Sequence, residues 1–279
     1  MSITYKKYYQ TINSIKWPDR FLMGEGWRPG TLYHHLHQVR YFHAVKTVEA
    51  ALEKNNASQL TILDMGYSPG TLGIILHEFL GSKIKLIGSG MGSTPAMIQE
   101  LLDLKAYAEI HDADLDPLHY LYDSDAAASR IQVPDAAIDM VIAGEVFEHL
   151  SSPIHFIEEI SRVLKKDGIL FLTTPNVCYI GNIFRLLTKK SNFPPLEAST
   201  ITIPEQRPHV RLYAAGEIRQ LMADENLEEV KHYFIDGQDD KFRVKALSVR
   251  IKLFIIRCFY FIPHYRDQYI GIFYKPDMK

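Results

Sequence analysis

The sequence predicts an α/β fold in which a mostly parallel sheet is covered by helices on both faces. From about residue 60 onward, short apolar runs typical of strands alternate with amphipathic helical segments. The run IDMVIAG (138–144) is almost continuously apolar, as expected of a strand that is buried on both faces. The chain has 279 residues and is 47% hydrophobic, which is enough for one large core.

The predicted elements follow one another in βα order. Residues 1–58 are expected to form an N-terminal helical cap, with a helix over 32–52, and residues 59–279 to form the main domain. Strands are predicted at 60–65, 83–88, 107–110, 138–144, 169–174, 229–235 and 269–274, and helices at 71–80, 95–104, 153–164 and 216–227. The sequence KKDG (165–168) should end the helix before it with cations and a glycine. The proline groups of 177–212 indicate an insertion, and the last strand is placed antiparallel at the sheet edge.

Charge and cysteine content exclude some classes of protein. The net charge of −2 and the pI near 6.6 create no overall field that favours nucleic acid. Cys178 and Cys258 form no metal-ligand pattern and indicate a reducing compartment. The N-terminus lacks the apolar core of a signal peptide, and no run reaches the roughly 18–20 apolar residues that span a bilayer. We therefore expect a cytoplasmic protein.

A glycine turn joins the first strand of the main domain to a helix, in LDMGYSPGTLG (63–73). Gly66 and Gly70 allow the backbone to approach a ligand closely, and the helix that follows offers unpaired N–H groups. Asp64 at the strand end can accept a hydrogen bond from an ammonium group. A tight turn without a ligand is the alternative. The later stretch GSGMGS (88–93) also suggests a dinucleotide loop, but Ser93 stands where that motif requires its third glycine.

Four segments together resemble the class I S-adenosylmethionine-dependent methyltransferases. They are ILDMGYSPGT, DMVIAGEVFEHL, SRVLKKDGILFLTTPN and HVRLYAAGEIRQLM, in the family's order and spacing. The resemblance covers roughly residues 30–235 and is closest to bacterial small-molecule, quinone and cell-envelope saccharide O-methyltransferases. It implies a Rossmann-like, doubly wound, mostly parallel seven-stranded sheet with one antiparallel edge strand. It also implies S-adenosyl-L-methionine as the cofactor.

The resemblance places the cofactor at the ends of the first four strands. The residues that it assigns to the cofactor are Asp64, Gly66, Tyr67, Ser68, Gly70, Gly90, Met91, Asp112, Asp114 and Glu145. Two of these positions depart from the family pattern. Ser68 replaces a glycine, and Gly90 replaces the acid that binds the ribose hydroxyls, a loss worth roughly ten- to a hundredfold in affinity unless Ser89 or Ser93 compensates. A non-catalytic methyltransferase-like binding protein is therefore kept as an alternative.

The sequence GEVFEHL places Glu145, Glu148 and His149 just after the fourth strand. A helical conformation here would make Glu145 and Glu148 neighbours at i, i+3. We expect His149, with Glu148, to act in catalysis, with His149 as the base that removes a hydroxyl proton. A purely structural hydrogen-bonding role is the first alternative. The second is a divalent metal held by Glu145, Glu148, His149 and His209, which resembles metal-dependent relatives that methylate quinones or the terminal ribose of small RNAs.

Residues 241–266 are predicted to form a basic, apolar helix between the last two strands. The segment holds seven lysines and arginines and no acid. Such a composition suits a helix in a membrane interface, a grip on single-stranded RNA, or a core helix with solvated cations. We expect O-methylation of a small or lipid-linked acceptor, such as a cell-envelope saccharide or a quinone-like molecule, with peripheral contact of 241–266 to the inner membrane surface. Metal-dependent methylation of RNA ribose is the less favoured alternative.

Overall fold

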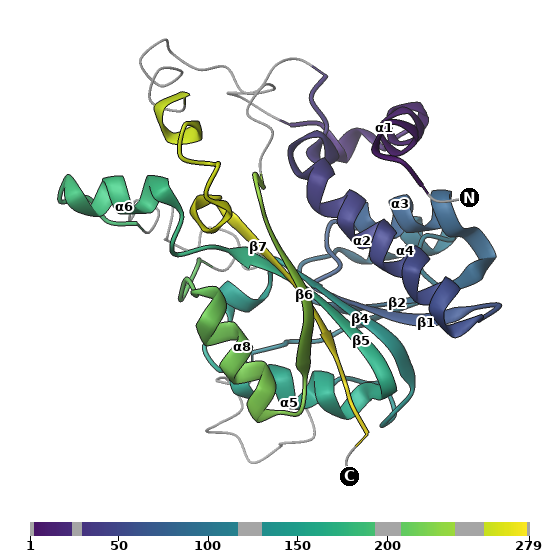
Figure 1. The fold of residues 1–279 in the computed structure, drawn as a ribbon. Coiled ribbons are helices and arrows are strands. Elements are labelled where there is room, and N and C mark those ends of the chain that lie inside the picture. Colours follow the sequence, from purple (N-terminus) through teal and green to yellow (C-terminus); the bar gives the residue numbers. More distant parts are fainter. Residues whose placement is uncertain (1–2, 24–29, 117–129, 193–207, 238–253, 278–279) are drawn as a thin grey trace.

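A seven-stranded sheet runs through the centre of the computed structural model, which describes residues 3–23, 30–116, 130–192, 208–237 and 254–277 (Figure 1). The strands are β1 (Leu60–Met65), β2 (Ile84–Gly90), β3 (Glu109–Asp112), β4 (Ile138–Gly144), β5 (Leu164–Pro175), β6 (Glu228–Ile235) and β7 (Gln268–Tyr274). The α-helices are α1 (Tyr5–Ser14), α2 (Tyr33–Asn55), α3 (Thr71–Leu80), α4 (Pro95–Asp103), α5 (Pro153–Val163), α6 (Ile180–Leu187) and α8 (Ala215–Asp224).

The strand order is β3-β2-β1-β4-β5-β7-β6. The pairs among β1 to β5 are parallel, and β7 is antiparallel to both β5 and β6. These pairings confirm the predicted fold class. The predicted edge position of the antiparallel strand was wrong, because β7 lies one strand in from the edge and β6 forms the edge. β7 is buried along most of its length, whereas β6 carries exposed charged side chains, which suit an edge.

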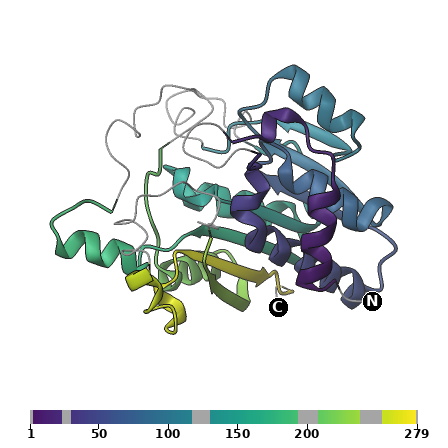
Figure 2. The same cartoon turned by 90° about the horizontal axis from the view of Figure 1, so that it is seen from above.

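Two apolar cores cover the two faces of the sheet. Ile62 and Met140 point into a core that is shared with α1, α2 and α3. Leu63 and Val141, one residue further along the same strands, point into the opposite core with α5 and α8. This alternation follows from the two-residue period of a strand. Figures 1 and 2 show the two helical layers on either side of the sheet. The N-terminal helix α2 thus packs on the main core beside α3.

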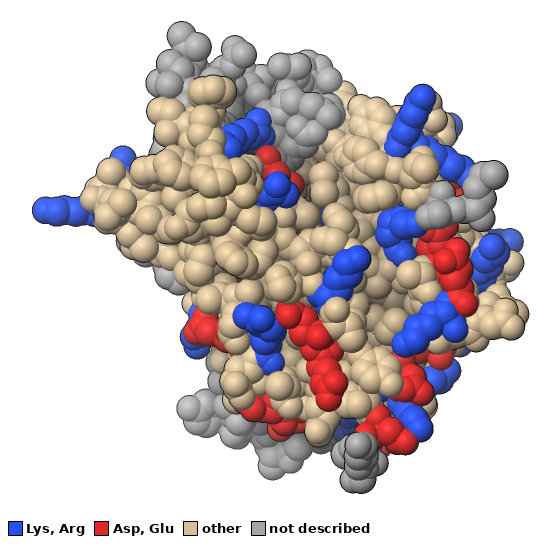
Figure 3. Space-filling model, in the orientation of Figure 1, with Lys and Arg blue, Asp and Glu red and all other residues tan. Residues whose placement is uncertain are grey.

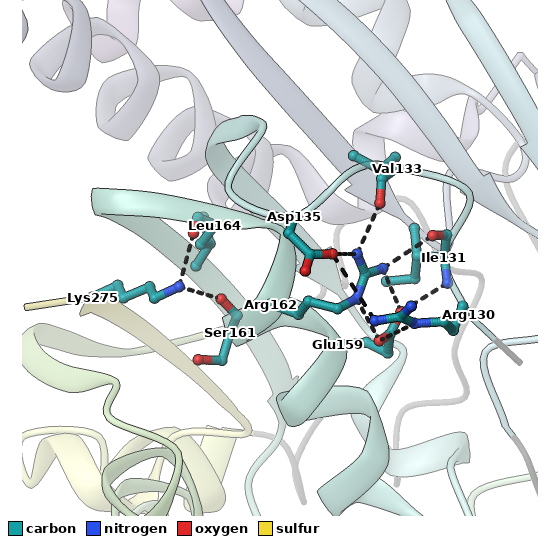
Figure 4. Close-up of polar contacts among 9 residues, drawn as sticks. All are labelled: Arg130, Ile131, Val133, Asp135, Glu159, Ser161, Arg162, Leu164 and Lys275. Carbon is teal, nitrogen blue, oxygen red and sulfur yellow. Dashed lines mark hydrogen bonds and ion pairs between the residues drawn. The ribbon is translucent and has the colours of Figure 1, made fainter. Parts of the chain in front are cut away.

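The passage from α5 to β5 differs from the prediction. The helix ends at Val163 and the strand begins at Leu164, so KKDG belongs to the strand and does not form a separate turn. Asp167 takes the left-handed conformation, with φ +64°, in place of Gly168. The end of the helix is held from a distance in the chain, because Lys275 Nζ donates to the carbonyl oxygens of Ser161 and Leu164 (Figure 4).

Arg162 fastens the last turn of α5 to the segment that leads into β4. Its guanidinium donates to the carboxylates of Glu159 and Asp135 and to the carbonyl oxygens of Ile131 and Val133 (Figure 4). The Arg162 side chain is 15% exposed, so these bonds are partly shielded from water. This network fixes the start of β4, whose other end opens onto the site.

Two predicted segments lie partly outside the described residues. The insertion 177–212 contains α6, and its residues 193–207 are not described. Of the basic segment 241–266, residues 241–253 are not described. Residues 254–257 are helical, and turns and a 3₁₀ turn over Pro263–Tyr265 follow, so the predicted helix does not continue to residue 266. Within the described ranges, the helices lack the combination of length and apolar character that a bilayer crossing requires.

Candidate functional site

Two adjoining hollows open at the carboxyl ends of β1 and β4. The strand order reverses between these two strands, and such a point is where open α/β sheets bind ligands. The smaller hollow holds about 120 Å³ and the larger about 600 Å³. Both are lined by Tyr33, Gly66, Ser68, Pro69 and Glu145, so together they form one continuous site.

The glycine turn after β1 has the conformation that its sequence predicts. Gly66 has φ +77°, and a Cβ there would lie 2.3 Å from Val146 Cγ2, so only glycine fits. Its N–H donates to the carbonyl oxygen of Ser89 at 2.8 Å, which joins the ends of β1 and β2. Gly70, with φ +92°, precedes α3 and lies outside the lining of both hollows. Gly70 therefore contributes to the conformation of the turn without facing either hollow.

The side chains of Tyr67 and Ser68 leave the hollows open. Tyr67 is only 3% exposed and packs edge-on against Tyr107, with ring centroids 5.7 Å apart. The hydroxyl of Ser68 donates to the carbonyl oxygen of Gly92 at 3.3 Å and ties the turn to the loop after β2. The serine that replaces the family's glycine therefore stabilises the contact between two loops of the protein.

Gly90 stands where the family carries its ribose-binding acid, and the local backbone disfavours a side chain there. Its φ is +150°, and a Cβ would lie 3.2 Å from Gly66 Cα. The larger hollow is instead lined by Met91, Asp114 and Glu145. Asp112 pairs with Gly90 across the β2–β3 ladder but is exposed and lies outside the lining of both hollows.

The smaller hollow is lined by a buried carboxyl group, that of Asp64, and by a buried cation, that of Arg40. Asp64 is 3% exposed and accepts a hydrogen bond from the Tyr107 hydroxyl at 2.6 Å. Burial raises the pKa of Asp64 to about 7, and the bond from Tyr107 and the charge of Arg40 limit the rise. Thr71, the first residue of α3, also lines the hollow.

Arg40 of α2 is the charged residue that the sequence reasoning missed. It is 5% exposed and lines the smaller hollow, with Nη1 3.5 Å from Glu145 Oε2. A signal was available, because a charged residue stands at four-residue spacing within an apolar stripe of the helix. The other members of that stripe are Leu36, Ala44 and Val48. Arginine is almost never fully buried unless it is paired, so a buried arginine that lines a hollow is a candidate functional group.

Glu145 lines both hollows and is held from β5. The hydroxyl of Thr173 donates to Glu145 Oε1 at 2.9 Å. Glu145 has φ +58°, and a 3₁₀ turn follows over Phe147–His149. The α-helical spacing considered for the two glutamates does not occur, since the chain bends between them. Glu148 points into the protein and lines neither hollow, and it accepts from the Thr174 hydroxyl at 2.9 Å.

Glu148, His149 and His209 form a compact group. Glu148 Oε1 lies 3.8 Å from His149 Nε2 and 3.9 Å from His209 Nε2, and their ligand atoms all lie within 4.8 Å of one another. Burial, with a smaller contribution from the Glu145 charge, raises the pKa of Glu148 well above its usual range. Burial, and next to it the neighbouring His149, lowers the pKa of His209.

His149 is the member of this group that lines the larger hollow. Its Nδ1 lies 3.2 Å from the carbonyl oxygen of Pro208. A carbonyl only accepts, so Nδ1 carries the proton in this contact and Nε2 keeps its lone pair. An imidazole fixed in this tautomer can accept a proton or ligate a metal ion.

Comparison with known proteins agrees with this geometry. A family described as "Methyltransferase domain" matches residues 33–232. A probable S-adenosylmethionine-dependent methyltransferase of Mycobacterium tuberculosis is 39% identical over 51 residues, which are 18% of this chain and 19% of that protein. The aligned stretch is thus about a fifth of that relative's length.

Two solved structures share the fold at low identity. A chain of the complex between the Haloferax volcanii Trm112 methyltransferase activator and a putative methyltransferase gives a TM-score of 0.54 at 17% identity, covering 87% of this chain and 92% of that one. A putative sarcosine dimethylglycine methyltransferase from Galdieria sulphuraria gives 0.52 at 12% identity, covering 86% of each chain.

Proposed function

Because the chain belongs to the methyltransferase domain family, we propose that it transfers a methyl group from S-adenosyl-L-methionine to a hydroxyl oxygen of a small or lipid-linked acceptor. A cell-envelope saccharide and a quinone-like molecule are the acceptor classes that we favour. The observation that carries the proposal is His149, which lines the larger hollow with Nδ1 bound to a carbonyl and Nε2 left as a proton acceptor. A hydroxyl acceptor needs such a base, because it loses a proton when it is methylated.

The buried charges of the smaller hollow suit the amino-acid end of the cofactor. The Asp64 carboxylate matches an ammonium group and the Arg40 guanidinium matches a carboxylate. In the larger hollow, Asp114 offers a carboxylate where position 90 has none, so we assign the ribose hydroxyls to Asp114. When bound, S-adenosyl-L-methionine supplies a methyl group that its sulfonium already activates.

The chain's own residues have three tasks in this scheme. The glycine turn and the Asp64–Arg40 pair orient the methyl donor, and orientation supplies most of the rate in a transfer of this kind. Glu145, held by Thr173 and 3.5 Å from Arg40, keeps the Arg40 guanidinium fixed in the smaller hollow. His149 Nε2 accepts the acceptor's proton, while the Pro208 carbonyl preserves the productive tautomer.

The test follows labelled methyl groups from S-adenosyl-L-methionine into lipid-linked saccharides, free saccharides and quinols. Methylated product should resist mild alkali, since an ether survives conditions that cleave an ester. His149→Ala should lower kcat by about 10²–10⁴-fold and change the affinity for S-adenosylhomocysteine little. Transfer to nitrogen, or unchanged kcat in His149→Ala, would contradict the proposal. Dissociation constants weaker than millimolar for both cofactor forms would favour the non-catalytic alternative.

A metal-dependent variant of this function has its own supporting observation. Glu148 Oε1 is buried and lacks a hydrogen-bond partner among the described residues, and it lies beside the Nε2 atoms of His149 and His209. A buried, unsatisfied carboxylate oxygen is costly unless an ion or a proton completes it. These three residues would hold a divalent cation, whose charge lowers the pKa of a nearby acceptor hydroxyl. RNA ribose is the alternative acceptor for this variant.

Chelator and His209→Ala separate the two versions. If an ion is required, both treatments should abolish transfer, and added Mn²⁺ or Zn²⁺ should restore the chelated protein but not the variant. His232→Ala is a matched control, because His232 on β6 also neighbours a glutamate, Glu229, at 3.1 Å. Full activity in chelator would remove the metal-dependent version and leave His149 as a base.

A further inference from the structure

One exposed lobe beside the site is apolar and basic. It consists of α6 with residues 188–190, and of residues 254–262, and we call it the apolar lobe. The two parts touch through Phe184 and Phe259, whose rings meet edge to face with centroids 5.8 Å apart. Figure 2 shows the yellow segment beside α6, and Figure 1 shows both projecting from the end of the sheet.

Asn176 anchors both parts of the apolar lobe to the end of β5. Its Nδ2 donates to the carbonyl oxygens of His264 and Arg266 at 2.8 Å each. Asn182 of α6 in turn donates to the carbonyl oxygen of Asn176. Because β5 also carries the threonines that hold Glu145 and Glu148, the lobe sits in a fixed relation to the reactive end of the site.

The apolar side chains of this lobe are exposed to an unusual degree. Phe261 is 77% exposed, Leu187 75% and Phe254 71%. Leu186 and Ile255 are also exposed. Large apolar side chains scattered singly on a surface need no explanation, but five gathered in two touching segments mark an interaction surface.

The charged residues within the two segments of the lobe are all basic. The segments 180–192 and 254–266 contain five lysines and arginines and no aspartate or glutamate. Lys189 and Lys190 are exposed at the end of α6, while Arg257 pairs with Asp236 at 3.2 Å. In Figure 3 the upper left of the molecule, which carries this lobe, is mostly tan with blue at its margins and little red.

This combination selects one kind of partner. Protein interfaces are depleted in lysine at their centre, and a second copy of the same lobe would place cations against cations. Exposed aromatic and aliphatic side chains bordered by lysines are the composition of a surface that enters the interface of an anionic bilayer. We propose that the apolar lobe docks this protein on an anionic lipid surface, with Phe254 and Phe261 entering the acyl boundary and Lys189 and Lys190 meeting the headgroups.

Docking on a bilayer extends the proposed function. It rests on that function only for the reason why docking would be useful, which is access to a lipid-linked acceptor. A bilayer against the apolar lobe would lie next to the end of β5 and hence next to the acceptor side of the hollows. The methyl acceptor would then be a lipid-linked molecule presented from that bilayer. Docking itself does not require the methyl donor, so binding to lipid and binding of the cofactor can be measured separately.

The test is sedimentation of the full chain with vesicles of phosphatidylcholine alone and of phosphatidylcholine mixed with phosphatidylglycerol. We expect binding to the mixed vesicles and a weakening of roughly tenfold or more in Phe254→Ser/Phe261→Ser. Val230→Ser, an exposed apolar residue on β6, is the matched control and should bind as the unaltered protein does.

The charge arm uses Lys189→Glu/Lys190→Glu, which should also cost roughly tenfold on mixed vesicles. The control pair Lys6→Glu/Lys7→Glu lies exposed on α1 and should have no effect. Retained binding of S-adenosylhomocysteine shows that each variant is folded. Equal binding by Phe254→Ser/Phe261→Ser and the unaltered protein would overturn the proposal. So would a dimer that this variant abolishes in the absence of any vesicle binding. Vesicle binding without any cofactor binding would instead sink the proposed function alone.

Discussion

Asp64 should make cofactor affinity depend on pH. Burial raises the pKa of this carboxyl to about 7, so below that pH the empty protein holds it mostly protonated. An ammonium group beside Asp64 favours the ionised form. The empty protein therefore binds the proton more tightly than the complex does. Binding of S-adenosylhomocysteine should release a proton at pH 6 and should strengthen as the pH rises, levelling off above about pH 7.

The size of the effect follows from the pKa. With a pKa of about 7, the ionised fraction of Asp64 is roughly 3% at pH 5.5 and roughly 75% at pH 7.5. If only the ionised form binds well, the dissociation constant should fall roughly 25-fold between these pH values, which is about 1.9 kcal/mol. Asp64→Asn should remove the slope and leave weak binding at every pH, since an amide cannot ionise.

Isothermal titration at several pH values, in two buffers of different ionisation enthalpy, measures both the affinity and the released proton. Glu148→Gln is the matched control. The pKa of Glu148 is also raised by burial, but its side chain lines neither hollow, so its variant should keep the slope. A flat profile in the unaltered protein, or an unchanged slope in Asp64→Asn, would refute the assignment of the ammonium to Asp64.

Substitutions at three positions test the site and the fold further. Gly90→Asp restores the family's acid on paper but should weaken S-adenosylhomocysteine binding about tenfold or more, because its Cβ would press on Gly66; titration calorimetry decides the sign. Arg40→Met should weaken the same binding by roughly ten- to a hundredfold and leave Glu145 without its cation; Arg40→Lys should recover part of the loss. Arg162→Met should lower the free energy of unfolding by about 3 kcal/mol in urea titrations, yet change cofactor affinity less than about twofold, since its bonds lie away from the hollows. If Arg162→Met lost cofactor affinity together with stability, the expected independence of this network from the cofactor site would be contradicted.

Sequence patterns sufficed for most of the fold because parallel strands buried on both faces are nearly uninterrupted apolar runs. The order of β6 and β7 was missed, although a local signal existed. The run YIGIFY (269–274) is wholly apolar, whereas EEVKHYFI (228–235) begins with charges. The apolar strand belongs inside the sheet and the charged one at its edge. The role predicted for KKDG as the end of α5 was wrong for a different reason. The end of α5 is completed by Lys275, more than a hundred residues away in the chain, and no local sequence pattern indicates such a contact.

The motif also predicted much of the site, since most of the residues assigned to the cofactor line one of the two hollows. Arg40 was missed because it lies in a helix outside the motif. The bend at Glu145 was missed because its positive φ depends on bonds to Thr173, across the sheet. The grouping of His149 with His209 depends on the backbone of 208–211 docking on the carbonyl oxygen of Glu148, a contact that spans about sixty positions of the chain.

The two departures from the family motif are coupled through space. Gly90 has no Cβ, and this allows the backbone of Gly66 to approach within van der Waals contact. The same close approach brings Ser68 within reach of the Gly92 carbonyl, two residues after Gly90. A Cβ at 90 would press on Gly66 and push the two loops apart by a few tenths of an ångström, which would strain that bond. The acid-free second strand and the serine in the turn are therefore two parts of one tighter junction, and a hollow of about 600 Å³ remains beside it. Under the proposed function, Asp114 and Arg40 supply the charges that the altered motif lacks, and their side chains line the larger and the smaller hollow, respectively.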